Sequence, residues 1–238
     1  MKLKILVADR QIVRPGDVLA IIEDEEYKLK YFPEKHVYIM GNRVYSDILG
    51  IANISNGDVS VIPLEGTYIP RPGDLVIGVI SGVGITSWVV DIRSPYKGIL
   101  NGSEVIENFN PIIHNLRDYL DVGDYILAKV ASFDRTRDPI LTVKGKELGK
   151  ITRGVIIEVK PSRVPRIIGK KGSMLSMLTN MTQCSIVVGQ NGVLWIDCPR
   201  EDVLNALLEA INIINTKPHM RGLTEEVRLY LMQKLGKV

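Results

Sequence analysis

The 238-residue sequence is poor in the residues that build metal sites and disulfide frameworks. It contains two cysteines, three histidines, two tryptophans and three phenylalanines. Zinc sites usually draw four ligands from such residues, often as closely spaced pairs, and Cys184 and Cys198 form no such pair. The sequence therefore predicts no metal and no other cofactor, and it favours two reduced, half-buried cysteines in strands.

Long apolar runs are also missing. No stretch approaches the roughly 18 to 20 apolar residues that a membrane-spanning helix needs. Residues 1–7 alternate lysine with apolar residues and have no signal-peptide core. We therefore expect a cytoplasmic protein without membrane contact, and the length allows two or three small domains.

Charge is unevenly distributed along the chain. Residues 1–144 carry 16 Lys and Arg against 19 Asp and Glu, a net of −3, whereas residues 145–238 carry 14 against 8, a net of +6. Within 150–172, seven basic residues stand against one acid, Glu158. Concentrated positive potential attracts phosphates, although charge alone is more simply explained by a solvated basic surface.

A recurring turn precedes several apolar runs. Pro15-Gly16-Asp17, Pro72-Gly73-Asp74 and Val122-Gly123-Asp124 each come before a run rich in β-branched residues. This pattern predicts a turn followed by a strand. The spacing of the three turns is irregular, so it does not indicate a repeat architecture.

Residues 1–65 are predicted to form a small β-rich domain. Asn56-Gly57-Asp58 is a hairpin signal between two β-branched runs. The acidic run 23–26 is either an exposed loop or a docking surface for a basic partner. The two prolines within 68–73 indicate a domain boundary, because proline cannot pair within a central strand.

Residues 66–146 predict a five-stranded barrel of the OB type, which binds single strands through aromatic stacking and a basic groove. The expected strands cover 75–81, 87–92, 98–100, 125–133 and 140–143. A more helical insert is expected over 108–120, between the third and fourth strands.

Residues 147–238 predict a compact α/β domain. The expected elements are a strand over 154–159, a short helix, a glycine loop, a helix over 173–182, strands over 186–188 and 193–196, and a long helix after Pro199. Ser173 is suited to cap the second helix. Trp195, in the last strand, is expected in the core.

The glycine loop Gly169-Lys170-Lys171-Gly172 joins the first two helices of this domain. Its glycines permit close approach of another backbone, and amides at the start of the following helix favour anions. Its two lysines place positive charge where phosphates would lie, while Ile167 and Ile168 anchor the loop to the core. The loop therefore predicts binding of phosphates, such as those of a nucleic-acid backbone.

The segment 164–173 resembles the signature of a KH domain of the eukaryotic and archaeal type. Residues 72–80, 87–92 and 97–100 resemble an S1-type OB domain. Together with an N-terminal β domain, this order resembles the RNA-binding cap subunit of the archaeal exosome. The resemblance implies a multidomain chain, β-rich plus α/β: an N-terminal β domain (1–65), an S1-type OB barrel (66–146), and a type-I KH domain (147–238) with a C-terminal helical extension.

In that family the cap subunits are not catalytic. They form a trimer on a hexameric ring of phosphorolytic RNase subunits, capture single-stranded RNA and feed its 3′ end into the ring. The resemblance implies that residues 1–65 dock on the ring. It also implies a homotrimer, or a mixed trimer with a sister subunit that carries a zinc ribbon in place of the KH domain.

The S1 segment departs from the family pattern in its aromatic residues. Of two aromatics typical of the second strand, only Trp88 is present, and it either stacks on RNA or packs in the barrel core. We expect this domain to contact RNA mainly through charge, at Lys97, Arg135, Arg137 and Lys144. Alternatively, the two arginines belong to a solvated loop and are neutralised by Asp134 and Asp138.

In the KH segment, the expected RNA contacts are Arg163, Arg166, Ile168, Gly169, Lys170, Lys171 and Gly172. No catalytic residue is expected, because the acids are scattered or occupy turns and no nucleophile–base arrangement is present. The alternative function is an S1/KH RNA-binding factor that acts in translation or transcription outside the exosome.

Overall fold

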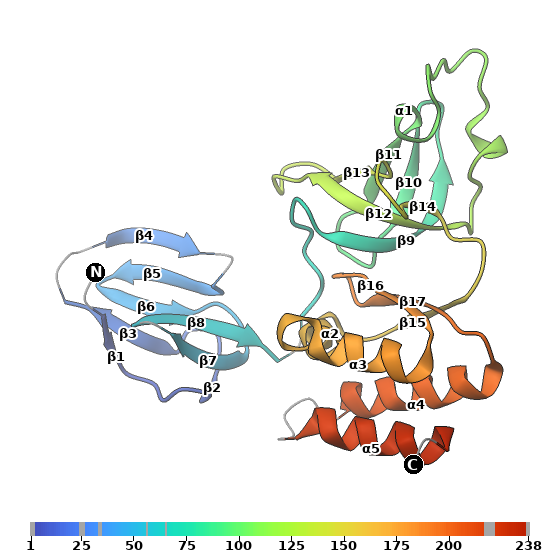
Figure 1. The fold of residues 1–238 in the computed structure, drawn as a ribbon. Helices are drawn as coiled ribbons and strands as arrows, with labels where there is room; N and C mark the ends of the chain where they lie inside the picture. Colours follow the sequence, from blue (N-terminus) through green and yellow to red (C-terminus); the bar gives the residue numbers. More distant parts are fainter. Residues whose placement is uncertain are drawn as a thin grey trace. The chain divides into compact units, whose positions relative to one another are not determined.

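The computed structural model of the chain describes residues 3–23, 27–32, 35–55, 57–64, 66–216 and 222–236, with the backbone alone for 27–31. The chain forms two compact units, residues 1–66 and 67–238 (Figure 1). No helix in these described stretches is long and apolar enough to cross a membrane. Asn56 and residues 24–26 of the acidic run lie outside the described residues.

The first unit contains two antiparallel sheets. The larger has the order β1 (Leu3–Ile5), β3 (Val18–Ile22), β6 (Arg43–Ser46), β5 (Val37–Gly41) and β4 (Tyr27–Phe32). The smaller has the order β2 (Ile12–Val13), β7 (Gly50–Ser55) and β8 (Asp58–Pro63). The predicted hairpin joins β7 and β8, since Ser55 pairs with Asp58. Apolar residues of both sheets, including Leu19 and Ala52, form the core of this unit.

The second unit begins with a closed barrel. Its strands are β9 (Leu75–Val83), β10 (Ser87–Asp91), β11 (Gly98–Asn101), β12 (Tyr125–Ser132) and β13 (Ile140–Thr142). They pair in the order β13-β11-β10-β9-β12, and β12 pairs in turn with β13, which closes the barrel. The OB-type prediction is therefore confirmed. A short strand, β14 (Gly149–Lys150), extends the sheet beside β12.

The predicted helical insert is mostly wrong. Residues 108–120 contain turns and one 3-10 turn, η1 (Leu116–Asp118), and the short helix α1 (Gly102–Val105) precedes them. Asn110 Oδ1 accepts a hydrogen bond from the Ile112 N–H, and Asn115 Oδ1 accepts one from Arg117. Such local side-chain bonds to the backbone compete with helix formation.

The three predicted turn-and-strand signals are confirmed, because each turn leads into a strand (β3, β9 or β12). The central glycines adopt φ values of 89°, 92° and 96°, which favour glycine. In each turn the aspartate carboxylate accepts a backbone N–H from three residues earlier: Asp17 from Arg14 at 2.7 Å, Asp74 from Arg71 at 3.0 Å, and Asp124 from Asp121 at 2.9 Å. These three aspartates therefore stabilise the turns.

The remaining residues of the second unit confirm the element order of a type-I KH domain. The elements are β15 (Val155–Glu158), η2 (Pro161–Arg163), α2 (Val164–Ile168), η3 (Lys170–Gly172), α3 (Ser173–Thr182), β16 (Ser185–Val188), β17 (Val193–Asp197) and α4 (Glu201–Thr216). The sheet is antiparallel, with the order β15-β17-β16. A further helix, α5 (Leu223–Leu235), packs against α4 and α3.

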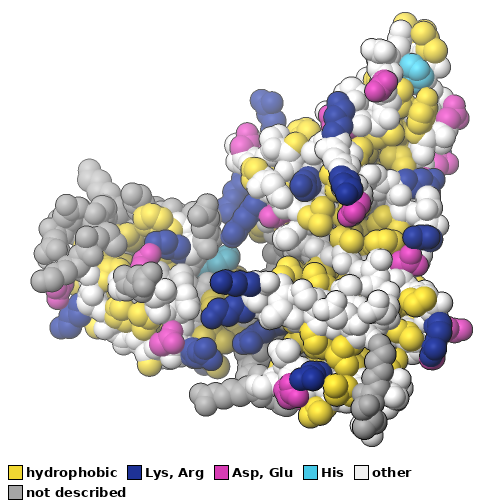
Figure 2. Space-filling view, in the orientation of Figure 1, with side chains coloured by type: hydrophobic (Ala, Val, Ile, Leu, Met, Phe, Trp, Pro, Cys, Tyr) yellow, Lys and Arg dark blue, Asp and Glu magenta, His cyan; other side chains and the backbone are white. Residues whose placement is uncertain are grey.

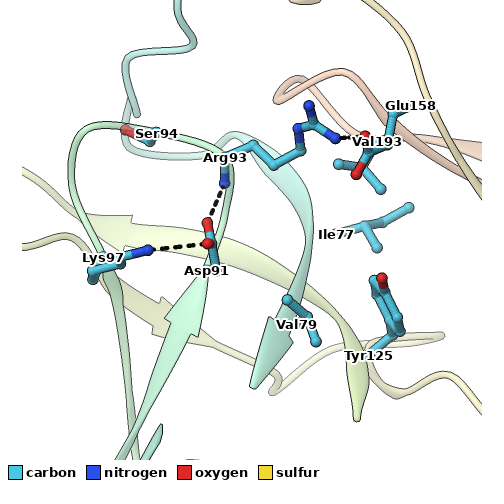
Figure 3. A pocket seen from close by; sticks show the side chains of 9 residues that line it. All are labelled: Ile77, Val79, Asp91, Arg93, Ser94, Lys97, Tyr125, Glu158 and Val193. Carbon is cyan, nitrogen blue, oxygen red and sulfur yellow. Dashed lines mark hydrogen bonds and ion pairs between the residues drawn. The ribbon is translucent and has the colours of Figure 1, made fainter. Parts of the chain in front are cut away.

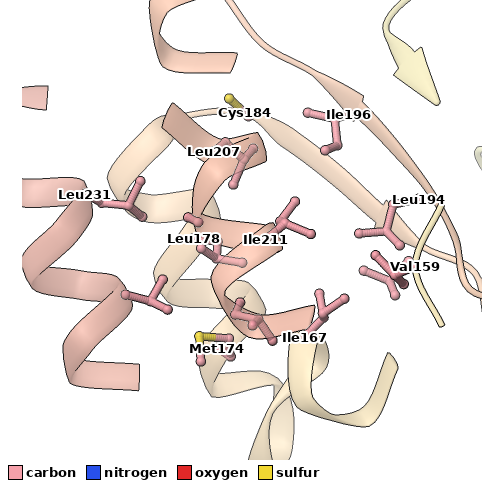
Figure 4. Close-up of a cluster of buried hydrophobic side chains, with 14 of the residues drawn as sticks. Val159, Ile167, Met174, Leu178, Cys184, Leu194, Ile196, Leu207, Ile211 and Leu231 are labelled. Atoms are coloured by element: carbon pink, nitrogen blue, oxygen red, sulfur yellow. The ribbon is translucent and has the colours of Figure 1, made fainter. Parts of the chain in front are cut away.

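The KH sheet is buried on both faces. Leu194 and Ile196 of β17 join the helices in one core (Figure 4). The alternate residues Val193 and Trp195 point the other way, because successive side chains of a strand face opposite sides. They belong to a cluster that also contains Ile77 and other barrel side chains. We call this contact between the barrel and the KH sheet the seam.

The sequence predicted that Trp195 lies in the core. Its side chain is instead half-buried at the seam, outside the KH core. Its Nε1 donates a hydrogen bond to the carbonyl oxygen of Arg153 at 2.6 Å.

The hairpin loop 189–192 fixes the seam by hydrogen bonds. Asn191 is 1% exposed, and its Nδ2 donates to the carbonyl oxygens of Ile77 at 2.7 Å and Ile92 at 3.0 Å. Gln190 exchanges two bonds with the backbone of Leu75, donating its own N–H at 2.8 Å and accepting at Oε1 at 2.9 Å. The barrel and the KH domain are thereby held as one unit.

The expectation of two reduced cysteines is wrong, because Cys184 and Cys198 form a disulfide. They flank the pair Ser185 and Asp197, which are register partners of β16 and β17. The two cysteines thus face each other across the open end of the hairpin, with Cα atoms 4.3 Å apart. Pairing of β16 with β17 brings the two cysteines together. Their separation in the sequence did not indicate this contact.

Candidate nucleic-acid interface

The glycine loop has a backbone that only glycine can adopt at its first position. Gly169 has φ 76° and ψ 173°, and a Cβ there would lie 2.6 Å from the backbone nitrogen of Met174. Lys171 and Gly172 also have positive φ, 54° and 79°. Gly172 has open space around it, with Ser176 Oγ at 4.0 Å as the nearest atom to a Cβ. The first glycine is thus required by packing and the second by φ alone.

The glycine loop is anchored to the KH core by two isoleucines and carries two exposed lysines. Ile167 is fully buried in the KH core, and Ile168 packs against the same cluster. Lys170 and Lys171 are exposed, and no carboxylate in the described stretches lies in an ion pair with either. Basic side chains gather near the end of α2 on the face shown in Figure 2. The loop therefore presents uncompensated positive charge.

The start of α3 adds to the attraction for anions. Gly172 is the N-cap residue, and no side chain caps the helix. The predicted cap by Ser173 is wrong, because Ser173 is already the first helical residue. The free N–H groups of a first helical turn and the helix dipole both favour a negatively charged partner. They lie directly after the two lysines.

Two arginines, Arg163 and Arg166, lie shortly before this loop in the sequence. Arg166 is exposed in the last turn of α2. Arg163 is half-buried at the start of α2, and its Nε is buried with no acceptor among the described residues. A buried donor without a partner carries a desolvation cost of about 1–3 kcal/mol.

The stacking interpretation of Trp88 is wrong. Its side chain is 0% exposed in the barrel core, and its Nε1 donates to the carbonyl oxygen of Leu120 at 2.8 Å. A ring without an exposed face cannot stack on a base. Trp88 is therefore a core residue, which was the alternative that the sequence left open.

Two of the predicted barrel cations have acidic partners. Lys97 Nζ lies 3.0 Å from Asp91 Oδ2, and Lys144 Nζ lies 3.5 Å from Glu104 Oε1. Burial disfavours the ionised form of Asp91, but hydrogen bonds from the Arg93 N–H and the Lys97 ammonium outweigh it and lower the pKa of Asp91. Both lysines thus carry partly compensated charge.

Arg135 and Arg137 are exposed without ion pairs to described residues. Asp134 accepts hydrogen bonds from Thr136 N and Oγ1 at 2.9 and 2.8 Å. Asp138 accepts one from the Lys97 N–H at 3.1 Å. The hydrogen bonds from Thr136, and then the backbone N–H and the charge of Arg137, lower the pKa of Asp134. This acid therefore supports the loop and also partly offsets the charge of Arg137.

An aromatic pair beside these cations was missed by the sequence analysis. The rings of Tyr96 and Phe133 pack edge to face with centroids 4.7 Å apart, and both are half-buried. Tyr96 precedes Lys97, and Phe133 lies two residues before Arg135. The sequence could have indicated this pair, because an aromatic residue lies close to a predicted cation in each of the two segments.

Family models match two of the three domains. Residues 154–202 match the KH domain family, and residues 10–65 match the family described as the exosome RNA binding protein RRP4 N-terminal domain. A crystal structure of an exosome complex RNA-binding protein superposes with a TM-score of 0.68 and 43% sequence identity, over 72% of this chain and 99% of that chain.

Relatives also match over nearly the whole chain. The exosome complex component Rrp4 of Thermosphaera aggregans is 59% identical over 99% of this chain and 96% of its own length. The Rrp4 component of Saccharolobus solfataricus is 40% identical over 98% of this chain and 92% of its own length. At these identities over nearly the whole chain, the protein belongs to the Rrp4 family of exosome complex components.

Proposed function

We propose that this protein is a non-catalytic RNA-binding subunit of an exosome, and that it captures single-stranded RNA. The observation that carries the proposal is the glycine loop 169–172. Its two lysines form no ion pair with a described residue, and they stand beside a helix start that no side chain caps. Three phosphate-binding elements coincide there: cations, backbone N–H groups and a glycine that permits close approach.

The contacts fall into two groups. In the KH domain, Arg163, Arg166, Lys170 and Lys171 contact phosphates, while Ile168, Gly169 and Gly172 form the surface that the backbone approaches. In the barrel, Arg135 and Arg137 are the stronger candidates, because Lys97 and Lys144 share their charge with Asp91 and Glu104.

The role in the complex is delivery of RNA to catalytic subunits. We infer that residues 1–65 dock on a hexameric phosphorolytic ring, that three caps sit on it as a homotrimer or a mixed trimer with the zinc-ribbon subunit, and that the assembly is cytoplasmic. The names of the relatives, which are exosome components along the full chain, support this role over a translation or transcription factor. The use of the aspartates in turns supports a non-catalytic chain.

A charge-reversal variant tests the loop. Lys170→Asp with Lys171→Asp should weaken single-stranded RNA binding at low salt and flatten the plot of log affinity against log salt by about 1.4 units, or roughly 0.7 per phosphate contact. The control is Lys4→Asp with Lys129→Asp, which makes the same charge change at exposed strand positions. Equal behaviour of the two variants would mean that the loop is only a turn.

The barrel is tested in parallel. If it dominates RNA binding, Arg135→Ala with Arg137→Ala will weaken binding more than the loop variant. Assembly is tested by native mass measurement with a purified ring, for which three copies per ring are expected. Failure to bind any ring would reject the assignment to an exosome while leaving RNA binding untouched.

A further inference from the structure

A cleft of about 500 Å³ opens at the seam, apart from the glycine loop (Figure 3). Its volume lies within the roughly 300–1,000 Å³ of typical small-ligand sites. Residues of both domains line it, because the hairpin loop 189–192 holds the KH sheet against β9. The cleft is thus built by the fixed arrangement of barrel and KH domain.

One side of the cleft is apolar. It is lined by Ile77 and Val79 of β9, Val193 of β17 and Tyr125 on β12. Ile77 and Val193 are almost fully buried, so Val79 and the Tyr125 ring supply the exposed surface of this side. Tyr125 pairs directly with Val79 across the two strands, and 37% of it is exposed. Figure 3 shows the Tyr125 side chain below Ile77 and beside Val79. A flat apolar ligand face would find contact here.

The other side carries two ion pairs. Lys97 binds Asp91, and Arg93 of the barrel binds Glu158 of the KH domain. Arg93 also has a positive φ of 55°, and its N–H donates to Asp91 Oδ1 at 2.9 Å. Backbone strain of this kind is concentrated at binding sites. The wall thus offers donors and acceptors side by side.

The charge of this wall selects the ligand chemistry. Two cations and two carboxylates cancel, so the cleft offers no net attraction to a phosphate. A nucleobase suits it, because a base has flat π-faces and an edge that carries both hydrogen-bond donors and acceptors. Carboxylates of Asp91 and Glu158 can accept from exocyclic amino groups, and Arg93 and Ser94 can donate to ring nitrogens and carbonyls.

We propose that the cleft binds a single unstacked nucleobase of single-stranded RNA, with Tyr125 as its stacking partner. The proposal rests on the proposed function and deepens it, since it adds a base-contacting site to the phosphate-contacting loop. Trp88, the residue expected to stack on a base, is in the barrel core, and the exposed residue nearby is Ile85, which has no aromatic ring. Tyr125 supplies an aromatic ring on a different face.

The first experiment measures RNA affinity by fluorescence anisotropy with a 12-nucleotide single strand of mixed sequence. Tyr125→Ala should weaken binding by about 5- to 150-fold, the range for loss of one base–aromatic stack. Tyr125→Phe should bind normally. Tyr119→Ala removes a tyrosine of the barrel that is 43% exposed and outside the cleft, and it should have no effect.

The salt dependence separates base binding from phosphate binding. Tyr125→Ala should lower affinity equally at every salt concentration, because no phosphate contact is lost. If Arg93→Gln instead flattened the slope by about 0.7, the cleft would hold a phosphate and the proposal would be rejected. If the lysine double variant loses affinity and Tyr125→Ala does not, the cleft proposal fails while the proposed function stands.

A second measurement does not depend on whether the variants fold well. Single abasic nucleotides are placed in turn along the same RNA, and binding to the unaltered protein should fall at one position by the same 5- to 150-fold. With that RNA, Tyr125→Ala should cause no further loss, because the two changes remove one interaction. Additive losses at every position would contradict base binding in the cleft.

Discussion

The side-chain amide of Asn191 donates a hydrogen bond to the carbonyl oxygen of Ile77 over 2.7 Å, and thereby joins the last hairpin of the chain to the first strand of the barrel. Both residues are almost fully buried. A buried amide that bonds a strand edge fixes both position and orientation, because losing either partner leaves a polar group unsatisfied. The base-binding cleft and the basic loop therefore keep a fixed distance from each other.

Asn191→Leu should destabilise the second unit by about 2–4 kcal/mol, because the carbonyls of Ile77 and Ile92 lose a donor in a buried site. Gln190→Ala, which removes one half-buried acceptor, should cost about 1 kcal/mol. Both tryptophans, Trp88 and Trp195, lie in the second unit, so urea unfolding followed by tryptophan fluorescence reports on it. Equal midpoints for the two variants would contradict the assigned role of Asn191.

The two glycines of the loop should respond differently to substitution. Gly169→Ala should destabilise the KH domain by about 1–3 kcal/mol, because its backbone conformation excludes a side chain and the added Cβ meets Met174. Gly172→Asn should fold normally, since asparagine tolerates left-handed φ and the surrounding space is open. Thermal unfolding of both variants checks this, and a larger loss for Gly172→Asn would refute it.

Alkaline pH should destabilise the protein through Tyr68. Burial, and then a hydrogen bond of 2.7 Å to Asp74, raise the pKa of its hydroxyl. A raised pKa means that its contribution is fully present below the unfolded value of about 10 and is lost as pH rises above it, at about 1.4 kcal/mol per pH unit. Urea unfolding of the wild type should therefore show no contribution from Tyr68 to the pH dependence between about pH 8 and 10 and this slope above about pH 10, and Tyr68→Phe should lack the slope.

Reduction of the disulfide should lower the melting temperature. The bond closes a loop with a sequence separation of 14, for which loop-closure entropy predicts about 3 kcal/mol. For a unit of this size the loss corresponds to roughly 6–12 °C. The control, Cys184→Ser with Cys198→Ser, should melt at the lower temperature with or without reductant. A wild-type melting temperature that is insensitive to reductant would rule out the stabilising role.

Local patterns in the sequence predicted the elements well, because their causes are local. The glycine–aspartate turns depend on φ of one residue and a carboxylate that reaches three residues back. The helix over 173–182 has the bounds that its apolar spacing predicted, and the long helix α4 follows Pro199 as expected. The loop between α2 and α3 was predictable because its glycines, lysines and anchoring isoleucines are consecutive.

Contacts between distant residues were not predictable in this way. The burial of Trp88 depends on closure of the barrel, and the bond between Asn191 and Ile77 joins residues 114 positions apart. The cleft combines a tyrosine of β12 with ion pairs from two domains. No periodicity or motif within one segment of the sequence indicates such contacts.

Because both faces of the KH sheet are buried, the KH domain cannot be separated from the barrel without exposing apolar side chains. A KH domain expressed alone would present Val193, Val187 and half of Trp195 to water, which favours aggregation. In a chimaera, the side chains of a new KH domain would have to pack against Ile77 and Leu127. The residue at position 191 would also have to carry a side-chain amide. We therefore expect that barrel and KH domain can be exchanged between relatives only as a pair.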